Sequence, residues 1–160
     1  MSYSSPAPAS ESGSRTAQKP IARVLIVDDD SAVRKAVAAV FRETGYETIE
    51  AHDGAHAMTQ FDAERPDVVL LDVNMPEKNG WQALDAIAKI DPLVPIIVIT
   101  ARPNQLGVAT GRGVDALMEK PLDFDILLDA VQRFVSQPMK DRCRRLTDPN
   151  FRTEFLSPVH

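Results

Sequence analysis

Two kinds of hydrophobic pattern alternate along the chain. Segments with the length of a β-strand, most of them rich in β-branched residues, lie at residues 21–27, 46–51, 68–71, 96–99 and 116–119. Segments whose apolar residues recur every three or four positions lie at residues 31–41, 55–61, 81–90 and 124–134. The pattern therefore predicts strands and helices in regular alternation. Residues 102–113 contain Pro103 and three glycines, so we expect the fourth helix to be short or irregular.

This alternation predicts a single α/β domain. Strands that are joined through helices run parallel, and helices then cover both faces of their sheet. The segment 68–71 is continuously apolar, as expected for a strand that is buried on both sides. We predict a flavodoxin-like, doubly wound sheet of five parallel strands in the order 2-1-3-4-5. Asp30 is expected to cap the first helix, and Gly45 is expected to end it with a positive φ.

Composition and charge divide the chain into three parts. Residues 1–20 contain six serines and three prolines, which predicts a disordered leader. Residues 21–135 form the predicted domain, and they carry a net charge of −8, against +1 for the leader and +2 for residues 136–160. An acidic domain disfavours direct DNA binding and is compatible with a cation site. The last 25 residues are too few for an effector domain, so we expect a basic tail that is either solvated or docked on a protein surface.

The sequence carries no membrane or export signal that we recognise. The longest apolar runs are strand-sized, and the leader lacks an apolar core, so we expect a cytoplasmic protein with no membrane association. The single cysteine, Cys143, excludes an internal disulfide. His52, His56 and His160 lack partners at a recognisable ligand spacing, and Trp81 is expected to pack in the core.

Polar residues gather where the predicted strands end. Asp28 and Asp29 follow the first strand, Asp72 the third, Thr100 the fourth and Lys120 the fifth. The carboxyl ends of parallel strands meet at one edge of a doubly wound sheet, where ligands bind. Carboxylates that are brought together at neutral pH repel one another, which favours a bound cation. Mg²⁺ prefers such hard oxygen ligands, so the sequence predicts a magnesium site at this edge.

A carboxylate beside a cation can also accept a phosphoryl group. Asp72 is the natural nucleophile and would form an acyl phosphate. Lys120 can place a positive charge near a phosphoryl oxygen. Thr100 can offer a hydroxyl donor that we expect to be satisfied only when that oxygen is present. This feature predicts a switch that is controlled by phosphorylation.

These residues resemble a known family. The resemblance is carried by Asp28-Asp29 after an apolar strand, Asp72 within Leu-Leu-Asp-Val-Asn-Met-Pro, Gly80, Thr100-Ala101 and Lys120-Pro121. Together they are similar to the receiver domain of two-component response regulators, over residues 21–135. The resemblance implies that Asp72 is the phosphorylation site, that Asp28, Asp29, Asp72 and the backbone carbonyl of Asn74 bind Mg²⁺, and that Thr100 and Lys120 complete the site. It also implies a cis bond between Lys120 and Pro121.

The resemblance further implies a signalling role. The phosphoryl donor would be a histidine kinase or a histidine phosphotransfer protein, and the signal would pass through protein–protein contacts or a phosphorelay. Such a chain accepts a phosphoryl group and can dephosphorylate itself, but it is not a dedicated enzyme. Leu117 replaces an aromatic residue that the family commonly has three positions before the lysine, so we expect a different or weaker output mechanism. Asn74 and Arg102 occupy positions that influence acyl-phosphate hydrolysis in this family.

Three alternatives remain open at this point. A Mg²⁺-dependent aspartyl-phosphate phosphohydrolase usually needs a second acid two residues after its nucleophile, where this chain has Asn74. A pseudo-receiver that serves only for docking would have an incomplete acidic site. A flavin or nucleotide carrier would have a glycine-rich loop after the first strand, where this chain has three aspartates. The pattern favours the receiver interpretation over all three.

Overall fold

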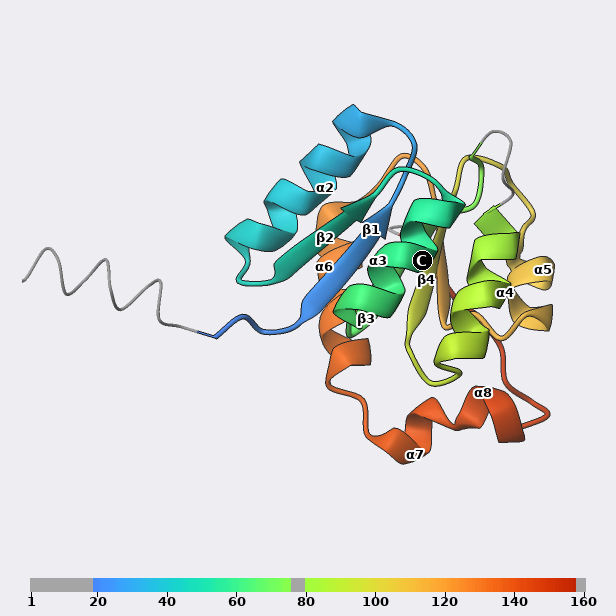
Figure 1. Cartoon of the computed structure of the whole chain (residues 1–160). Helices are drawn as coiled ribbons and strands as arrows, with labels where there is room; N and C mark the ends of the chain where they lie inside the picture. Colours follow the sequence, from blue (N-terminus) through green and yellow to red (C-terminus); the bar gives the residue numbers. More distant parts are fainter. Residues whose placement is uncertain (1–18, 76–79, 158–160) are drawn as a thin grey trace, which may run out of the picture.

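The computed structural model describes residues 19–75 and 80–157, and its centre is one parallel sheet with the strand order β2-β1-β3-β4-β5-β6 (Figure 1). The strands are β1 (Arg23–Val27), β2 (Glu47–Ala51), β3 (Val68–Asp72), β4 (Ile96–Thr100), β5 (Ala116–Glu119) and β6 (Glu154–Leu156). The helices are α2 (Ser31–Glu43), α3 (Gly54–Glu64), α4 (Gly80–Ile90), α5 (Leu106–Gly111), α6 (Phe124–Val135), α7 (Met139–Arg142) and α8 (Arg144–Thr147). The predicted order 2-1-3-4-5 is confirmed, but the sheet has a sixth strand at the β5 edge.

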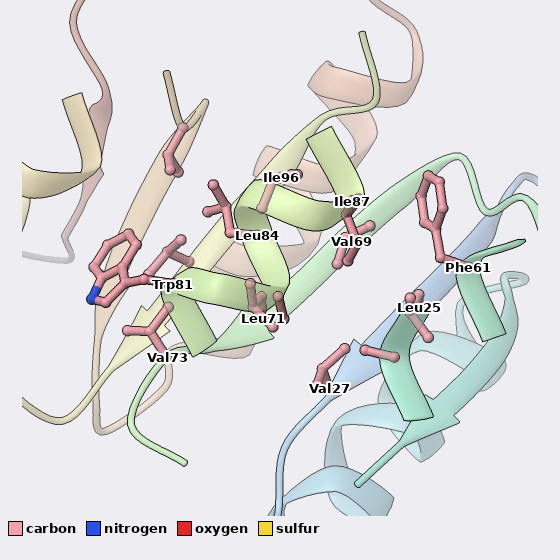
Figure 2. Close-up of a cluster of buried hydrophobic side chains, with 14 of the residues drawn as sticks. Leu25, Val27, Phe61, Val69, Leu71, Val73, Trp81, Leu84, Ile87 and Ile96 are labelled. Carbon is pink, nitrogen blue, oxygen red and sulfur yellow. The ribbon is translucent and has the colours of Figure 1, made fainter. Parts of the chain in front are cut away.

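Helices cover both faces of the sheet, because successive side chains of a strand point to opposite sides. On one face, α3 and α4 contribute Phe61, Leu84 and Ile87 to the hydrophobic cluster shown in Figure 2. On the other face, α2 and α6 contribute Phe41 and Leu127 to a second cluster. Strand β3 is buried at every residue, which explains its continuously apolar sequence. In the described part of the chain, no helix is both long and apolar enough to cross a membrane.

The ends of the elements follow local signals in the sequence. The side chain of Asp30 accepts hydrogen bonds from the N–H groups of Ala32 and Val33, which confirms the predicted cap of α2. Gly45 has a φ of 105°, as predicted for the residue that ends this helix. Helix α5 has only six residues, which confirms the short fourth helix. The first strand begins later than predicted, and Ile21 is exposed before it. Most of the predicted leader lies outside the described residues.

The segment 138–157, which we call the C-terminal strap, packs against the domain. Figure 1 shows α7 and α8 crossing below the sheet, at the end opposite to the carboxyl ends of the strands. Strand β6 pairs in parallel with β5, and the buried Leu156 lies opposite Met118. The hydroxyl of Thr153 donates to the carbonyl of Val114 at 2.7 Å. The expectation of a solvated tail is therefore wrong for this segment. It docks instead on the chain's own domain.

Two arginines hold the C-terminal strap in place. The side chain of Arg145 is only 6% exposed, and it forms an ion pair with Asp115. It also donates to the carbonyl of Val94 at 2.8 Å, just before β4. Arg142 donates to the carbonyl of Val135 at 3.2 Å and so satisfies the C-terminal end of α6. These charges make the predicted basic tail part of the folded structure.

Candidate phosphoacceptor and metal site

The carboxyl ends of β1 and β3 bring three aspartates together. Asp28 directly follows β1, and Asp72 is the last residue of β3; the two strands are neighbours, with Val27 opposite Leu71. Carboxylate oxygens of Asp28, Asp29 and Asp72 lie within 4.8 Å of one another. Asp28 and Asp72 are 4% and 3% exposed, while Asp29 is exposed. The structure therefore gathers the three carboxylates that the sequence singled out as metal ligands.

Lys120 links two of these carboxylates. Its Nζ atom lies 3.1 Å from Oδ2 of Asp72 and 3.3 Å from Oδ2 of Asp28. The residue follows β5, and its bond to Pro121 is cis, as the resemblance implied. One ammonium group thus faces two buried carboxylates, and Asp29 adds a third negative charge beside them. The cluster keeps an excess of negative charge, which a divalent cation would neutralise.

The ionisation of this cluster reflects burial as well as charge. Burial raises the pKa of Asp28 to about 6, and the charge of Asp72 acts in the same direction. The backbone N–H of Asp30, which donates to Asp28 Oδ1 at 2.9 Å, and the ammonium of Lys120 both oppose this shift. Burial lowers the pKa of Lys120, but the two neighbouring carboxylates outweigh burial, so the pKa of this lysine is raised. Lys120 therefore stays charged at neutral pH, while protons compete for Asp28 in slightly acidic solution.

The start of α4 packs closely against the end of β3. A Cβ atom on Gly80 would lie 2.4 Å from the Cα of Val73 and 2.7 Å from the carbonyl oxygen of Asp72. Only glycine lets the helix begin so near to this backbone, which explains the glycine of the motif. In the same loop, the N–H of Asn74 donates to Oδ1 of Asp72 at 2.8 Å. Both carboxylate oxygens of Asp72 are therefore held, one by the loop and one by the lysine.

Thr100 contradicts one of our predictions. Its buried hydroxyl donates to Oδ1 of Asn74 at 2.7 Å, and the N–H of Ala101 donates to the same oxygen at 2.6 Å. The prediction that this hydroxyl is satisfied only when a phosphoryl oxygen is present is therefore wrong. Residues 74 and 100 are far apart in the sequence, and only the fold places the loop after β3 against the end of β4. The sequence contained no signal for this pairing.

Arg34 is a residue near the site that the sequence analysis missed. Its Nη1 donates to the carbonyl oxygen of Asp28 at 2.8 Å, and its Nε donates to Oε1 of Glu50 at 2.9 Å. The side chain is 12% exposed, so this arginine is largely buried. The only signal for this role in the sequence was the position of a charged residue directly after the apolar Val33 of the helical segment. The arginine fixes the backbone at the point where β1 ends and the acidic residues begin.

Other residues that the sequence singled out have packing or surface roles. Trp81 is buried in the cluster of Figure 2, as predicted. Leu117, in place of the expected aromatic residue, is fully buried in β5. The rings of His52 and His56 contact each other in a tilted arrangement, with 4.4 Å between their centroids. His160 lies outside the described residues.

Comparison with known proteins matches the chain to one family. A family model described as the response regulator receiver domain matches residues 24–132. Sporulation initiation phosphotransferase F of Bacillus subtilis (strain 168) is 34% identical over 120 residues, which cover 74% of this chain and 95% of that protein. Other curated relatives are longer than the chain, which spans only 42% of the transcriptional regulatory protein TrcR of Mycobacterium tuberculosis.

Solved structures share the fold. A CheY-like response regulator receiver domain protein from Methanospirillum hungatei JF-1 has a TM-score of 0.70 at 25% identity, with 78% of this chain and 99% of that chain covered. The response regulator TrrA from Thermotoga maritima, in complex with Mg²⁺-BeF, has a TM-score of 0.65 at 29% identity, with 73% and 99% covered. These similarities confirm the predicted fold class.

Proposed function

The chain belongs to the response regulator receiver domain family, and on this premise we propose that Asp72 accepts a phosphoryl group from a histidine kinase or a histidine phosphotransfer protein. The single observation that carries the proposal is the position of Lys120, which touches both Asp72 and Asp28 within an acidic cluster. The phosphorylated chain then acts through protein–protein contacts or passes the group along a phosphorelay. The word phosphotransferase in the name of the Bacillus subtilis relative supports the relay.

The transfer needs little from the protein beyond position and charge. A carboxylate oxygen of Asp72 attacks the phosphorus of a phosphohistidine, so that an O–P bond forms while the P–N bond breaks. The electron pair of the broken bond stays on the imidazole nitrogen of the donor. Lys120 offsets negative charge on the transferring group. The N–H of Asn74 holds one oxygen of Asp72, which limits the directions from which the carboxylate can react.

The acidic cluster is suited to hold Mg²⁺. Asp28, Asp29, Asp72 and the backbone carbonyl of Asn74 would supply oxygen ligands only, which is the donor set that this ion prefers. When bound, the ion supplies positive charge that neutralises phosphoryl oxygens. The excess negative charge beside Lys120 supports this assignment, as does the complex of the relative TrrA with Mg²⁺-BeF.

Phosphorylation of the intact chain tests the proposal. The protein is incubated with Mg²⁺ and acetyl phosphate, and its intact mass is compared with that of Asp72→Asn and of the matched control Asp62→Asn. Asp62 lies on the surface in an ion pair with Arg65, so its variant reports the effect of losing an exposed carboxylate. We expect one phosphoryl group on the wild type and the control, none on Asp72→Asn, and none after chelation of the metal.

Three other outcomes would contradict the proposal. An unchanged mass of the wild type would favour a pseudo-receiver that serves only for docking. Steady release of phosphate without a detectable adduct would favour the phosphohydrolase, even though Asn74 cannot act as a general acid. An adduct on both Asp72→Asn and the wild type would place the phosphoryl group on another residue.

A further inference from the structure

The side chain of Asn74 lies between the phosphoacceptor and the end of β4. Its backbone N–H contacts Asp72, while its Oδ1 accepts hydrogen bonds from the hydroxyl of Thr100 and the N–H of Ala101. The register places Asp72 opposite Ile99, so these two donors follow directly after the partner of the phosphoacceptor. One residue thus connects Asp72 to two donors at the end of the neighbouring strand.

The hydrogen bonds determine which way the carboxamide points. The N–H of Ala101 can only donate, and it lies 2.6 Å from the side-chain atom of Asn74. An NH₂ group in that position would place two donors against each other, so the oxygen must face β4. The hydroxyl oxygen of Thr100 lies 2.7 Å from the same oxygen and 3.4 Å from the carbonyl oxygen of Arg102, so the hydroxyl donates to Asn74. Asn74 therefore presents one acceptor oxygen to two donors, as a phosphoryl oxygen would.

From this geometry we propose that the carboxamide of Asn74 is a latch, which occupies the Thr100 and Ala101 donors until a phosphoryl group on Asp72 displaces it. The proposal rests on the proposed function, because the displacing oxygen belongs to phosphorylated Asp72. The exchange is favourable because an anionic phosphoryl oxygen is a stronger acceptor than a neutral amide oxygen. Asn74 is a positioning residue in this scheme, since it acts through Thr100 and Ala101.

The latch changes what the switch consists of. Thr100 is buried, and both its hydroxyl and the Ala101 N–H already have an acceptor before phosphorylation. The two states differ instead in which oxygen these donors bind. The energy needed to release Asn74 lowers the apparent affinity of the site for a phosphoryl group. Removal of the carboxamide oxygen should therefore make occupation of the site easier.

Beryllofluoride, a phosphoryl mimic, allows this effect to be measured at equilibrium. Affinity is determined with saturating Mg²⁺ for the wild type, Asn74→Ala, Asn74→Asp and the matched control Asn150→Ala, whose residue lies exposed on the C-terminal strap. We expect Asn74→Ala to bind about five- to tenfold more tightly, which corresponds to about one net hydrogen bond released. Asn74→Asp keeps an acceptor oxygen, so it should not gain affinity, and the control should match the wild type.

Hydrogen exchange of the Ala101 amide provides a readout that does not depend on phosphorylation. Without ligand, this amide should exchange faster in Asn74→Ala than in the wild type, and Asn74→Asp should restore its protection. If the wild type forms no mass adduct at all, the proposed function fails. If the adduct forms but Asn74→Ala binds beryllofluoride no more tightly, or if the Ala101 amide stays protected, the latch alone is refuted.

Discussion

Buried aspartates face a cation at two places in this domain, and they do so in different ways. Asp28, at the carboxyl end of β1, shares the single ammonium of Lys120 with Asp72. Asp115, at the opposite end of the sheet, has the guanidinium of Arg145 to itself. In the first cluster negative charge exceeds positive charge, while in the second the two are equal.

The balance of charge distinguishes the candidate site around Asp28 from the Asp115–Arg145 pair, which holds the C-terminal strap. Burial raises the pKa of both Asp28 and Asp115, so burial alone does not distinguish them. Arg145 opposes the shift at Asp115 and also binds backbone carbonyls, so this pair is complete within the protein. The cluster around Asp28 reaches charge balance only with an added cation. An excess of buried negative charge, rather than a buried aspartate as such, therefore marks the candidate site.

Removal of the arginine from the balanced pair should have the largest effect on stability. Arg145→Ala leaves Asp115 buried without its partner and detaches the C-terminal strap from the carbonyl of Val94. We expect the free energy of unfolding to fall by about 3–5 kcal/mol, measured by urea denaturation. Arg144→Ala is the matched control, because the Arg144 side chain is 60% exposed and pairs with Asp148 on the surface.

The control substitution Arg144→Ala should lower the free energy of unfolding by less than about 1 kcal/mol. Equal effects of the two arginine substitutions would mean that Asp115 is not compensated by Arg145, and the comparison between the two clusters would no longer hold.

Removal of an aspartate from the unbalanced cluster should have the opposite effect on stability, because it should raise the free energy of unfolding. Asp28→Asn relieves repulsion with Asp72 and removes a carboxylate whose ionised form burial disfavours. In the presence of a chelator we expect the free energy of unfolding to rise by about 1–2 kcal/mol. In the same variant the affinity for Mg²⁺ should fall, as measured by the rise in melting temperature on adding the ion. A loss of stability without metal would show that Lys120 already balances the cluster.

The pH dependence of Mg²⁺ binding should show the smallest effect. The pKa of Asp28 is raised from 3.8 to about 6, and the charged groups that influence it are Asp72 and Lys120. Its contribution to stability is therefore fully present below pH 3.8 and is lost as the pH rises through about 6. Because Mg²⁺ needs the ionised carboxylate, we expect its affinity to fall about tenfold between about pH 7 and about pH 5.

Calorimetric titration at the two pH values measures this fall directly. Asp28→Asn serves as the comparison, since it has no carboxyl group to titrate at this position. An equal loss of affinity in the variant would assign the pH dependence to another group.

The sequence predicted the framework of the site well. Strand-length segments ending in Asp28, Asp72, Thr100 and Lys120 placed these residues at one edge, because parallel strands share their carboxyl ends. Local signals were equally reliable, as the cap at Asp30 shows. The cap depends on residues that are close together in the chain. The shared edge follows from a rule that holds for every fold of this class.

The sequence predicted the C-terminal strap poorly. Strand β6 has three residues, and only Leu156 of them is buried, so no periodic pattern could reveal it. Arg145 belongs to a basic stretch that is typical of a solvated tail. Its burial depends on Asp115 and on the carbonyl of Val94, which come from distant parts of the chain.

By itself, the sequence determined the order of strands, the family and the residues that meet at the acidic edge. Only the tertiary structure decided how those residues pair: that Lys120 is shared between two carboxylates, and that Asn74 already occupies the Thr100 hydroxyl. The physical reason is the range of the interactions. Periodicity and caps are set by neighbours along the chain, whereas hydrogen bonds and ion pairs depend on atoms that only the folded chain brings within a few ångströms.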